Sequence, residues 1–237
     1  MAITYVGNQE DTNAAATSPQ TISVNIGTRT NGLLVVSFKA YCGNNLSALS
    51  MTYNGVSLTA GTRKTRIISS PINYVAQHFY LVTPTNGTND LVITWTLDFG
   101  SSFTAKHIVA MWFDGAKQDQ ATVLDQEVSG EGSTDPSVDI TPSEDNELII
   151  GSYFSAANNV LSVGSGETLI NDWDAGSYVM GDSYVIQTAA GAQTVDFSGV
   201  DDNWIMVASS FRQYAAAAAA SLAPHRKGAN MAGLLVR

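Results

Sequence analysis

The feature that most constrains the fold is a succession of short strand-like runs separated by turn-forming residues. The run at 21–26 (TISVNI) alternates apolar and polar residues, and the run at 32–41 (GLLVVSFKAY) is apolar enough to be buried on both faces. The runs at 77–83 and 90–97 are separated by PTNGTN, a turn by composition. With only one plausible helix, the chain is expected to be all-β.

One hairpin can be placed from its turn residues. In the stretch 49–59 (LSMTYNGVSLT), Asn54-Gly55 lies between alternating residues. A type I′ turn needs positive φ at both central positions, which Asn and Gly tolerate. Further along, the polar joint between the two halves of the chain contains ATVLDQEV, which could add another strand.

The second half of the chain repeats this pattern weakly. The echoing runs are PSVDITP (136–142), ELIIGSYF (147–154), SYVIQTAAGAQTVDFSG (183–199) and WIMVASSFRQ (204–213). We therefore predict an antiparallel β-sandwich, jelly-roll-like, with a weak internal duplication and a C-terminal extension. Two tandem sandwiches are the alternative, but the second half is short for a free-standing domain, which favours interleaved halves. The predicted units are an N-terminal segment 1–19, a sandwich 20–213 with halves 20–118 and 135–213, and a C-terminal arm 214–237.

The net charge of −10 is unevenly distributed. Residues 1–118 carry 7 basic and 5 acidic residues, residues 119–214 carry 1 basic and 16 acidic residues, and residues 215–237 carry 3 basic and no acidic residues. An acidic middle argues against nucleic acid as a partner, because phosphate contacts need Lys and Arg. The basic end is expected to pair with an acidic surface, such as another copy of the chain.

Neither a signal peptide nor a membrane partner is expected. The N-terminus (MAITYVGNQEDT) lacks a charged segment followed by an apolar one, and no run approaches the ~18 apolar residues of a membrane span. We therefore expect the protein to be made in the cytoplasm. The single cysteine, Cys42, cannot form an intramolecular disulfide and is expected to be a partly buried small residue.

Taken together, the runs of the first half resemble a module of phage virion proteins and bacterial surface proteins. The residues that carry the resemblance are Leu33–Val36, Thr52–Thr59, Tyr80–Trp95 and Phe113–Gln118. It covers residues 20–118 closely, and 135–213 only through the internal echo. The resemblance implies a β-sandwich adhesion or structural module without catalytic chemistry. Its motif residues look like fold determinants, so it assigns no functional residue.

The motifs that would indicate catalysis or a metal are not found. His78 and His107 lie in predicted strands, where a lone histidine is expected to be structural, and His225 lies in the tail. No nucleophile elbow, P-loop or Cys/His metal spacing occurs. The acidic stretches NDWDAGS (171–177) and VDDNW (200–204) lack EF-hand spacing and are expected to be solvated turns. We expect no enzyme, no cofactor and no metal.

Carbohydrate binding through exposed aromatic side chains is the main alternative to a purely structural role. Trp95 and Trp112 lie in strand patterns and are expected in the core. The glycine-rich segment 162–183 is predicted to be a long loop with a short strand. Trp173, between two aspartates in that segment, and Tyr178 are the candidates for contact with a host-surface glycan.

The C-terminal tail is the remaining signal. Residues 214–222 (YAAAAAASL) could form two helical turns that end before Pro224, but so short an isolated helix is marginal in water. We expect the tail to bind a neighbouring subunit, the alternative being a tail that folds back on its own domain. The candidate subunit contacts are Arg226, Lys227, Met231, Leu234, Leu235, Val236 and Arg237.

The leading hypothesis is a non-enzymatic virion structural protein of a tailed phage, either a capsid decoration or cement protein or a tail or fibre-type subunit. Its expected partners are other copies of itself, often in a cyclic homo-oligomer, and other virion proteins. A carbohydrate-binding or host-adhesion module is the alternative. An enzyme such as a depolymerase is the third option, and it would need paired carboxylates in a cleft that the sequence does not place.

Overall fold

The structure, a computed structural model, describes residues 2–14, 16–69, 72–98, 103–156, 162–198 and 202–215. These residues form strands and no helix, so the all-β prediction is confirmed. The strands are β1 (Thr4–Asp11), β2 (Gln20–Asn25), β3 (Leu33–Cys42), β4 (Leu46–Tyr53), β5 (Val56–Ser57), β6 (Thr59–Ser69), β7 (Ile72–Val82), β8 (Thr88–Leu97), β9 (Phe103–Asp114), β10 (Leu124–Gly132), β11 (Ser137–Ile140), β12 (Glu147–Ser155), β13 (Ser162–Val163), β14 (Thr168–Asp174), β15 (Val179–Gln187), β16 (Gln193–Ser198) and β17 (Trp204–Phe211).

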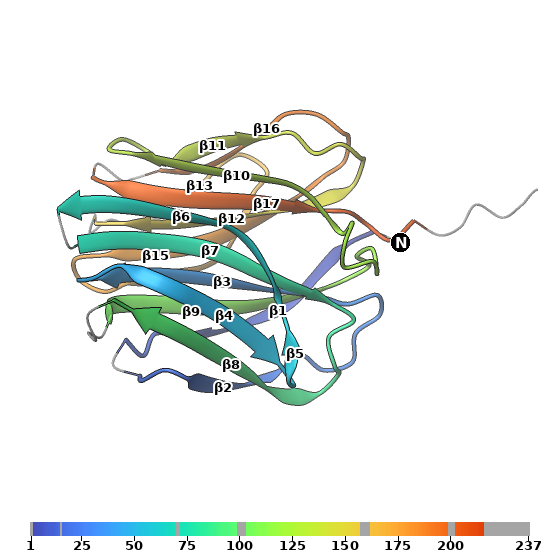
Figure 1. Cartoon of the computed structure of the whole chain (residues 1–237). Helices are drawn as coiled ribbons and strands as arrows, with labels where there is room; N and C mark the ends of the chain where they lie inside the picture. The colour runs from blue at the N-terminus through green and yellow to red at the C-terminus, as the bar shows by residue number, and fades with distance from the viewer. Residues whose placement is uncertain are drawn as a thin grey trace, which may run out of the picture.

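The strands form four antiparallel sheets stacked as layers. Inner sheet I has the order β1-β9-β3-β7-β6 and outer sheet I the order β2-β8-β4-β5. Inner sheet II has the order β10-β17-β12-β15-β14 and outer sheet II the order β11-β16-β13. Figure 1 shows the stack from the side, with β2 and β8 at the bottom and β11 and β16 at the top.

Each sheet takes its strands from one half of the chain. The interleaved arrangement that the sequence analysis preferred is therefore wrong for the sheets, and the tandem alternative describes them. Within each half most pairs join strands that are not consecutive, such as β1 with β9 and β2 with β8, so each half closes its own two sheets. The halves then meet through the faces of the two inner sheets. The two inner sheets have the same strand order when β1 is set against β10, and β2-β8-β4 corresponds in the same way to β11-β16-β13.

Strand β3 explains how one run of residues serves two layers. Leu34, Val36 and Phe38 join the apolar cluster between inner and outer sheet I, while Leu33 and Val35 join the cluster between the two inner sheets. Because successive side chains of a strand point to opposite faces, a strand buried on both faces must be apolar almost throughout. The prediction that this run is buried on both faces is confirmed.

The interface between the inner sheets has three zones. At one end lies an apolar cluster that includes Tyr80, Phe113 and Phe211. At the other end lies a second apolar cluster, which includes Tyr74 and Phe154. Between them is a polar band, made of buried side chains from both sheets: Ser37, Lys39, His78, Ser152, Asp182 and Ser209.

The structure agrees with some of the remaining sequence predictions and differs from others. Asn54 and Gly55 have φ values of 48° and 75°, as the predicted hairpin turn requires, and β10 occupies the polar joint where an extra strand was considered. The N-terminal segment contains β1, which pairs with β9 at the edge of inner sheet I. The segment 162–183, predicted to be a long loop with a short strand, contains β13, β14 and the start of β15, and β14 pairs with β15. No part of the described chain forms a helix long and apolar enough to span a membrane.

Candidate functional site

Both ends of the described chain lie at the same end of the sheet stack, beside the turn that follows β9. We call this region the chain-end pole. Gly115 has φ of 84°, and a Cβ there would lie 2.3 Å from the carbonyl oxygen of Ala2. On the other side of the turn, Tyr214 N–H donates to the Gly115 carbonyl at 2.7 Å, and Lys117 N–H donates to the Arg212 carbonyl at 2.9 Å. The mark for the N-terminus and the end of the orange strand β17 accordingly meet at the right of Figure 1.

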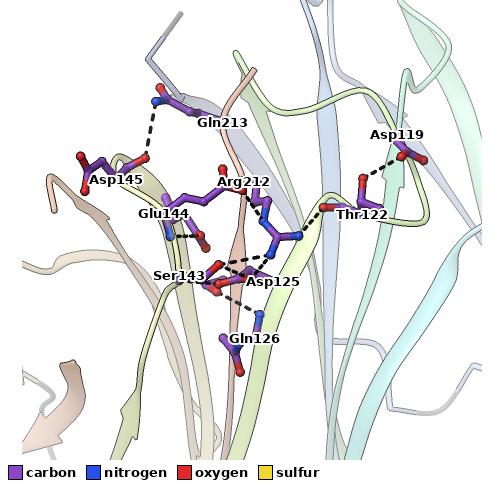
Figure 2. Close-up of polar contacts among 11 residues, drawn as sticks. Asp119, Thr122, Asp125, Gln126, Ser143, Glu144, Asp145, Arg212 and Gln213 are labelled. Atoms are coloured by element: carbon purple, nitrogen blue, oxygen red, sulfur yellow. Dashed lines mark hydrogen bonds and ion pairs between the residues drawn. The ribbon is translucent and has the colours of Figure 1, made fainter. Parts of the chain in front are cut away.

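Arg212 fixes the last residues of β17 to this pole. Its Nη1 donates to the carbonyl of Thr122 at 2.9 Å, and its Nη2 donates to Ser143 Oγ at 3.2 Å and to Asp125 Oδ1. Glu144 Oε1 lies 3.0 Å from Nε as an ion pair. Figure 2 shows the guanidinium at the centre of these groups, which come from residues 122–125 and from the loop between β11 and β12. Hydrogen bonds of both the side chain and the backbone therefore hold the chain in place just before residues 216–237.

The Asp125 carboxylate is nearly buried, with 2% of its side chain exposed. Ser143 donates to it twice, from N–H at 2.6 Å and from Oγ–H at 2.7 Å. Burial raises the pKa of Asp125, but these hydrogen bonds and the charge of Arg212 outweigh burial, so the pKa lies below its usual value. Asp125 therefore stays charged at neutral pH and pairs with Arg212.

Glu147, the first residue of β12, is a fully buried carboxyl beside this cluster. Its Oε1 accepts a hydrogen bond from the N–H of Glu144 at 2.9 Å, and Oε2 has no hydrogen-bond partner. Burial, reinforced by the negative charge of Asp125, raises the pKa of Glu147 to about 7 despite hydrogen bonds that favour the charged form. This carboxyl is consequently part protonated near neutral pH.

The polar band between the inner sheets is centred on a buried ion pair. Lys39 on β3 donates from Nζ to Asp182 on β15, and both side chains have 0% exposure. Lys39 Nζ also donates to Ser37 Oγ at 2.8 Å. Burial lowers the pKa of Lys39, and although burial alone would raise the pKa of Asp182, the charge of Lys39 and nearby donors lower it. The pair joins the two halves of the chain.

A chain of hydrogen bonds leads from this ion pair to the rim of the interface. Ser152 Oγ donates to Asp182 Oδ1 at 2.5 Å, so it accepts from His78 Nε2 at 2.7 Å, and His78 Nδ1 then accepts from Ser209 Oγ at 2.8 Å. Ser209 Oγ also lies 3.4 Å from a carboxylate oxygen of Glu127, which is partly exposed. Burial lowers the pKa of His78 to about 4, so the ring is neutral at pH 7.

The second strand histidine lies at the opposite rim. His107 Nε2 is 2.9 Å from Glu10 Oε2, its Nδ1 has no hydrogen-bond partner, and its ring centroid lies 5.6 Å from that of Trp173. Burial lowers the pKa of His107 more than the Glu10 carboxylate raises it. Both strand histidines thus lie in the predicted strands and contact groups of the inner-sheet interface.

The two glycan candidates lie together at the edge of the same interface. Trp173 is on strand β14 rather than in a loop, partly buried, and packs against the apolar cluster that contains Phe154. The ring of Tyr178 lies 4.7 Å from that of Tyr41 and 5.8 Å from that of Phe154. These rings fill the rim between the sheets.

Other candidates have definite positions. Trp95 and Trp112 are buried, as predicted, and Cys42 is fully rather than partly buried, which raises the pKa of its thiol to about 12. The acidic stretch 171–177 begins within β14 and is not a free turn. Within the described ranges, no group of three or more His, Cys, Asp or Glu side chains could hold a metal ion.

The tail candidates lie outside the described residues. They are His225, Arg226, Lys227, Met231, Leu234, Leu235, Val236 and Arg237. The predicted short helix at 214–222 lies almost entirely outside them as well, and only Tyr214 and Ala215 are described.

Sequence reasoning missed the residues that the structure brings together. Lys39 and Asp182 are 143 positions apart, and Arg212 and Asp125 are 87 apart. One signal was present: Lys39 interrupts a run of apolar residues that was predicted to be buried on both faces. A buried lysine needs a charge partner, although the sequence does not say which one.

Comparison of the chain with protein-family models, curated proteins and solved structures found no match in any of the three.

Proposed function

We propose that this chain is a non-enzymatic structural protein of a tailed-phage virion that assembles through its C-terminal arm. The resemblance of residues 20–118 to virion and surface modules gives the class of protein. The observation that supports the arm is the fixed exit point: Arg212 and Tyr214 are bonded into the chain-end pole immediately before residues 216–237. An arm that leaves from a rigid base loses less conformational freedom on binding than one that leaves from a mobile end.

Charge supports self-association as the assembly mode. The arm carries Arg226, Lys227 and Arg237 and no acidic residue, whereas residues 119–214 carry 16 acidic residues and 1 basic residue. Opposite charge on two surfaces steers encounter and fixes orientation. The apolar residues Leu234, Leu235 and Val236 would then be buried in a neighbouring subunit or in another virion protein.

The proposal includes the internal duplication. It is supported by the equal strand orders of the two inner sheets. An ion pair also occurs at corresponding positions with its charges exchanged: Arg29–Asp114 at 3.5 Å in the first half and Glu144–Arg212 at 3.0 Å in the second. The glycan alternative at Trp173 and Tyr178 has less support, because both rings pack into the inner-sheet interface.

The test is deletion of residues 216–237. The shortened chain retains Arg212 and the Tyr214–Gly115 bond, so we expect unchanged thermal unfolding. We also expect it to sediment as a monomer where the full chain forms oligomers, and to be lost from particles when co-produced with the other virion proteins.

Two matched variants separate the contributions of the arm. Replacement of Leu234, Leu235 and Val236 by Ser tests the apolar contact, and replacement of Arg226, Lys227 and Arg237 by Ser tests the charge. A truncated chain that assembles and enters particles normally would contradict the proposal.

A further inference from the structure

Two polar hollows lie on the first half of the chain, away from the inner-sheet interface. The first has a volume of about 400 Å³ and is lined by the loops before β3 and after β7 together with Gln118. The second, of about 380 Å³, is lined by residues of β4, β8 and the Asn54-Gly55 turn. A hydrogen bond of 3.2 Å from Asn54 Nδ2 to Thr85 Oγ1 joins a lining residue of one hollow to a lining residue of the other. The volumes match those of small-ligand sites.

The first hollow offers both donors and acceptors whose capacity is not used. The side chain of Asn31 makes no hydrogen bond to another described residue. Asn86 uses its Oδ1 to accept from the Arg29 N–H at 2.9 Å, which leaves its Nδ2 free to donate. Gln118 donates from Nε2 to the carbonyl of Ala116 at 2.6 Å, which leaves its Oε1 free to accept. Adjacent donors and acceptors of this kind are complementary to hydroxyl groups, which do both.

The lining of the hollow contains one charged side chain, which is paired with a carboxylate outside the lining. Arg29 is the cation in its lining, and Nη1 of Arg29 lies 3.5 Å from Asp114 Oδ2. The side chain of Arg29 is only 13% exposed, so most of it is withdrawn from the open hollow. Residues 1–118, which include the whole lining, carry 7 basic and 5 acidic residues, so this half has little net charge to attract an ion. A neutral ligand fits these electrostatics better than a charged one.

The backbone of the hollow is held in a conformation that its residues do not favour. Asn31 and Thr83 both line it, with φ values of 50° each. A β-branched residue such as Thr rarely adopts positive φ, and such strain costs about 1–3 kcal/mol per residue and clusters at ligand sites. At Asn31 the same φ means that glycine can replace asparagine with little effect on the backbone.

We propose that the first hollow binds a neutral, hydroxyl-rich ligand, a saccharide of one or two units that can extend towards the second hollow. This binding function is additional to assembly through the arm. Because the lining residues include no aromatic ring for stacking, affinity for one copy is in the millimolar range. Repetition of the site in an oligomer would raise the effective affinity.

The test is titration of the full chain with methyl α-D-glucoside, methyl β-D-galactoside, methyl α-D-mannoside and lactose, followed by NMR of the side-chain amide groups. We expect at least one of these neutral probes to shift the Asn31, Asn86 and Gln118 signals saturably. D-Glucuronate serves as the charged comparison and is expected to bind more weakly.

The matched variants are Asn31→Gly and Asn146→Gly. Asn146 has φ of 60° and lines neither hollow. Both substitutions therefore place glycine at a similar positive φ, but only Asn31→Gly removes an amide from the lining. We expect Asn31→Gly to weaken binding about tenfold, as for the loss of one to two neutral hydrogen bonds, and Asn146→Gly to leave it unchanged. Absence of saturable shifts with all four neutral probes, equal binding by Asn31→Gly, or tighter binding of glucuronate would each overturn the proposal.

Discussion

At the scale of single residues, Glu147 shows how burial sets the charge of a side chain. The carboxyl has 0% exposure, one hydrogen bond from a backbone N–H, and an oxygen without a partner. The nearby Arg212 guanidinium is paired with Asp125 and Glu144. Burial and the negative charge of Asp125 both disfavour the ionised form of Glu147. Its carboxyl therefore stays protonated at pH values at which most glutamates are ionised.

This pKa predicts a pH dependence that one substitution should remove. The folded pKa of Glu147 is about 7 against 4.5 in the unfolded chain, so the folded state binds the proton more tightly. The contribution of Glu147 to the free energy of unfolding is fully present below pH ~4.5 and is lost as pH rises through 7. Glu147→Gln should therefore raise the free energy of unfolding at pH 8 by about 1–2 kcal/mol and leave it nearly unchanged at pH 4.5. Urea unfolding at both pH values measures this, and an equal effect at the two would contradict it.

At the scale of elements, the strands most visible in the sequence are those buried on both faces. β3 and β12 are continuous apolar runs and were predicted as strands. β1 (TYVGNQED) is a partly exposed edge strand with mostly polar residues, so its pattern does not distinguish it from a loop. Which sheets face one another, and hence the polar band and the Arg212 cluster, depends on contacts between distant residues that local patterns do not encode.

The docking of β1 predicts different effects for two glycines with the same backbone conformation. Gly115 and Gly87 have φ of 84° and 85°, but a Cβ on Gly115 would lie 2.3 Å from the Ala2 carbonyl, while one on Gly87 would meet nothing within 4 Å. Gly87→Ala should cost about 1 kcal/mol from the backbone conformation alone. Gly115→Ala should cost about 1–2 kcal/mol more, with faster hydrogen exchange in Thr4–Asp11, because the N-terminal segment must move. Equal losses of stability would contradict this account of the chain-end pole.

At the scale of the whole molecule, the two halves are joined by an interface that is apolar at both ends and polar in the middle. The apolar ends stabilise contact between the inner sheets but are tolerant of sliding, since apolar contacts are not directional. The Lys39–Asp182 pair and the His78 hydrogen bonds require one register of β3, β7, β12 and β15. A displacement of the sheets would leave buried charges unpaired, which is a large energetic penalty.

A double-mutant cycle on Lys39 and Asp182 tests whether the pair acts mainly on register. Asp182→Leu leaves a buried lysine without its partner, and Lys39→Met leaves a buried aspartate, so each should lower the free energy of unfolding by about 3–5 kcal/mol. The double variant replaces the pair with apolar groups and should lie within about 1 kcal/mol of the natural chain or above it, a coupling of several kcal/mol. Urea unfolding measures the four free energies, and additive single effects would contradict the coupling.

If register is the role of the pair, the double variant should also show broadened NMR signals for residues of the polar band while it remains folded. Sharp signals identical to those of the natural chain would mean that the apolar clusters alone position the two halves.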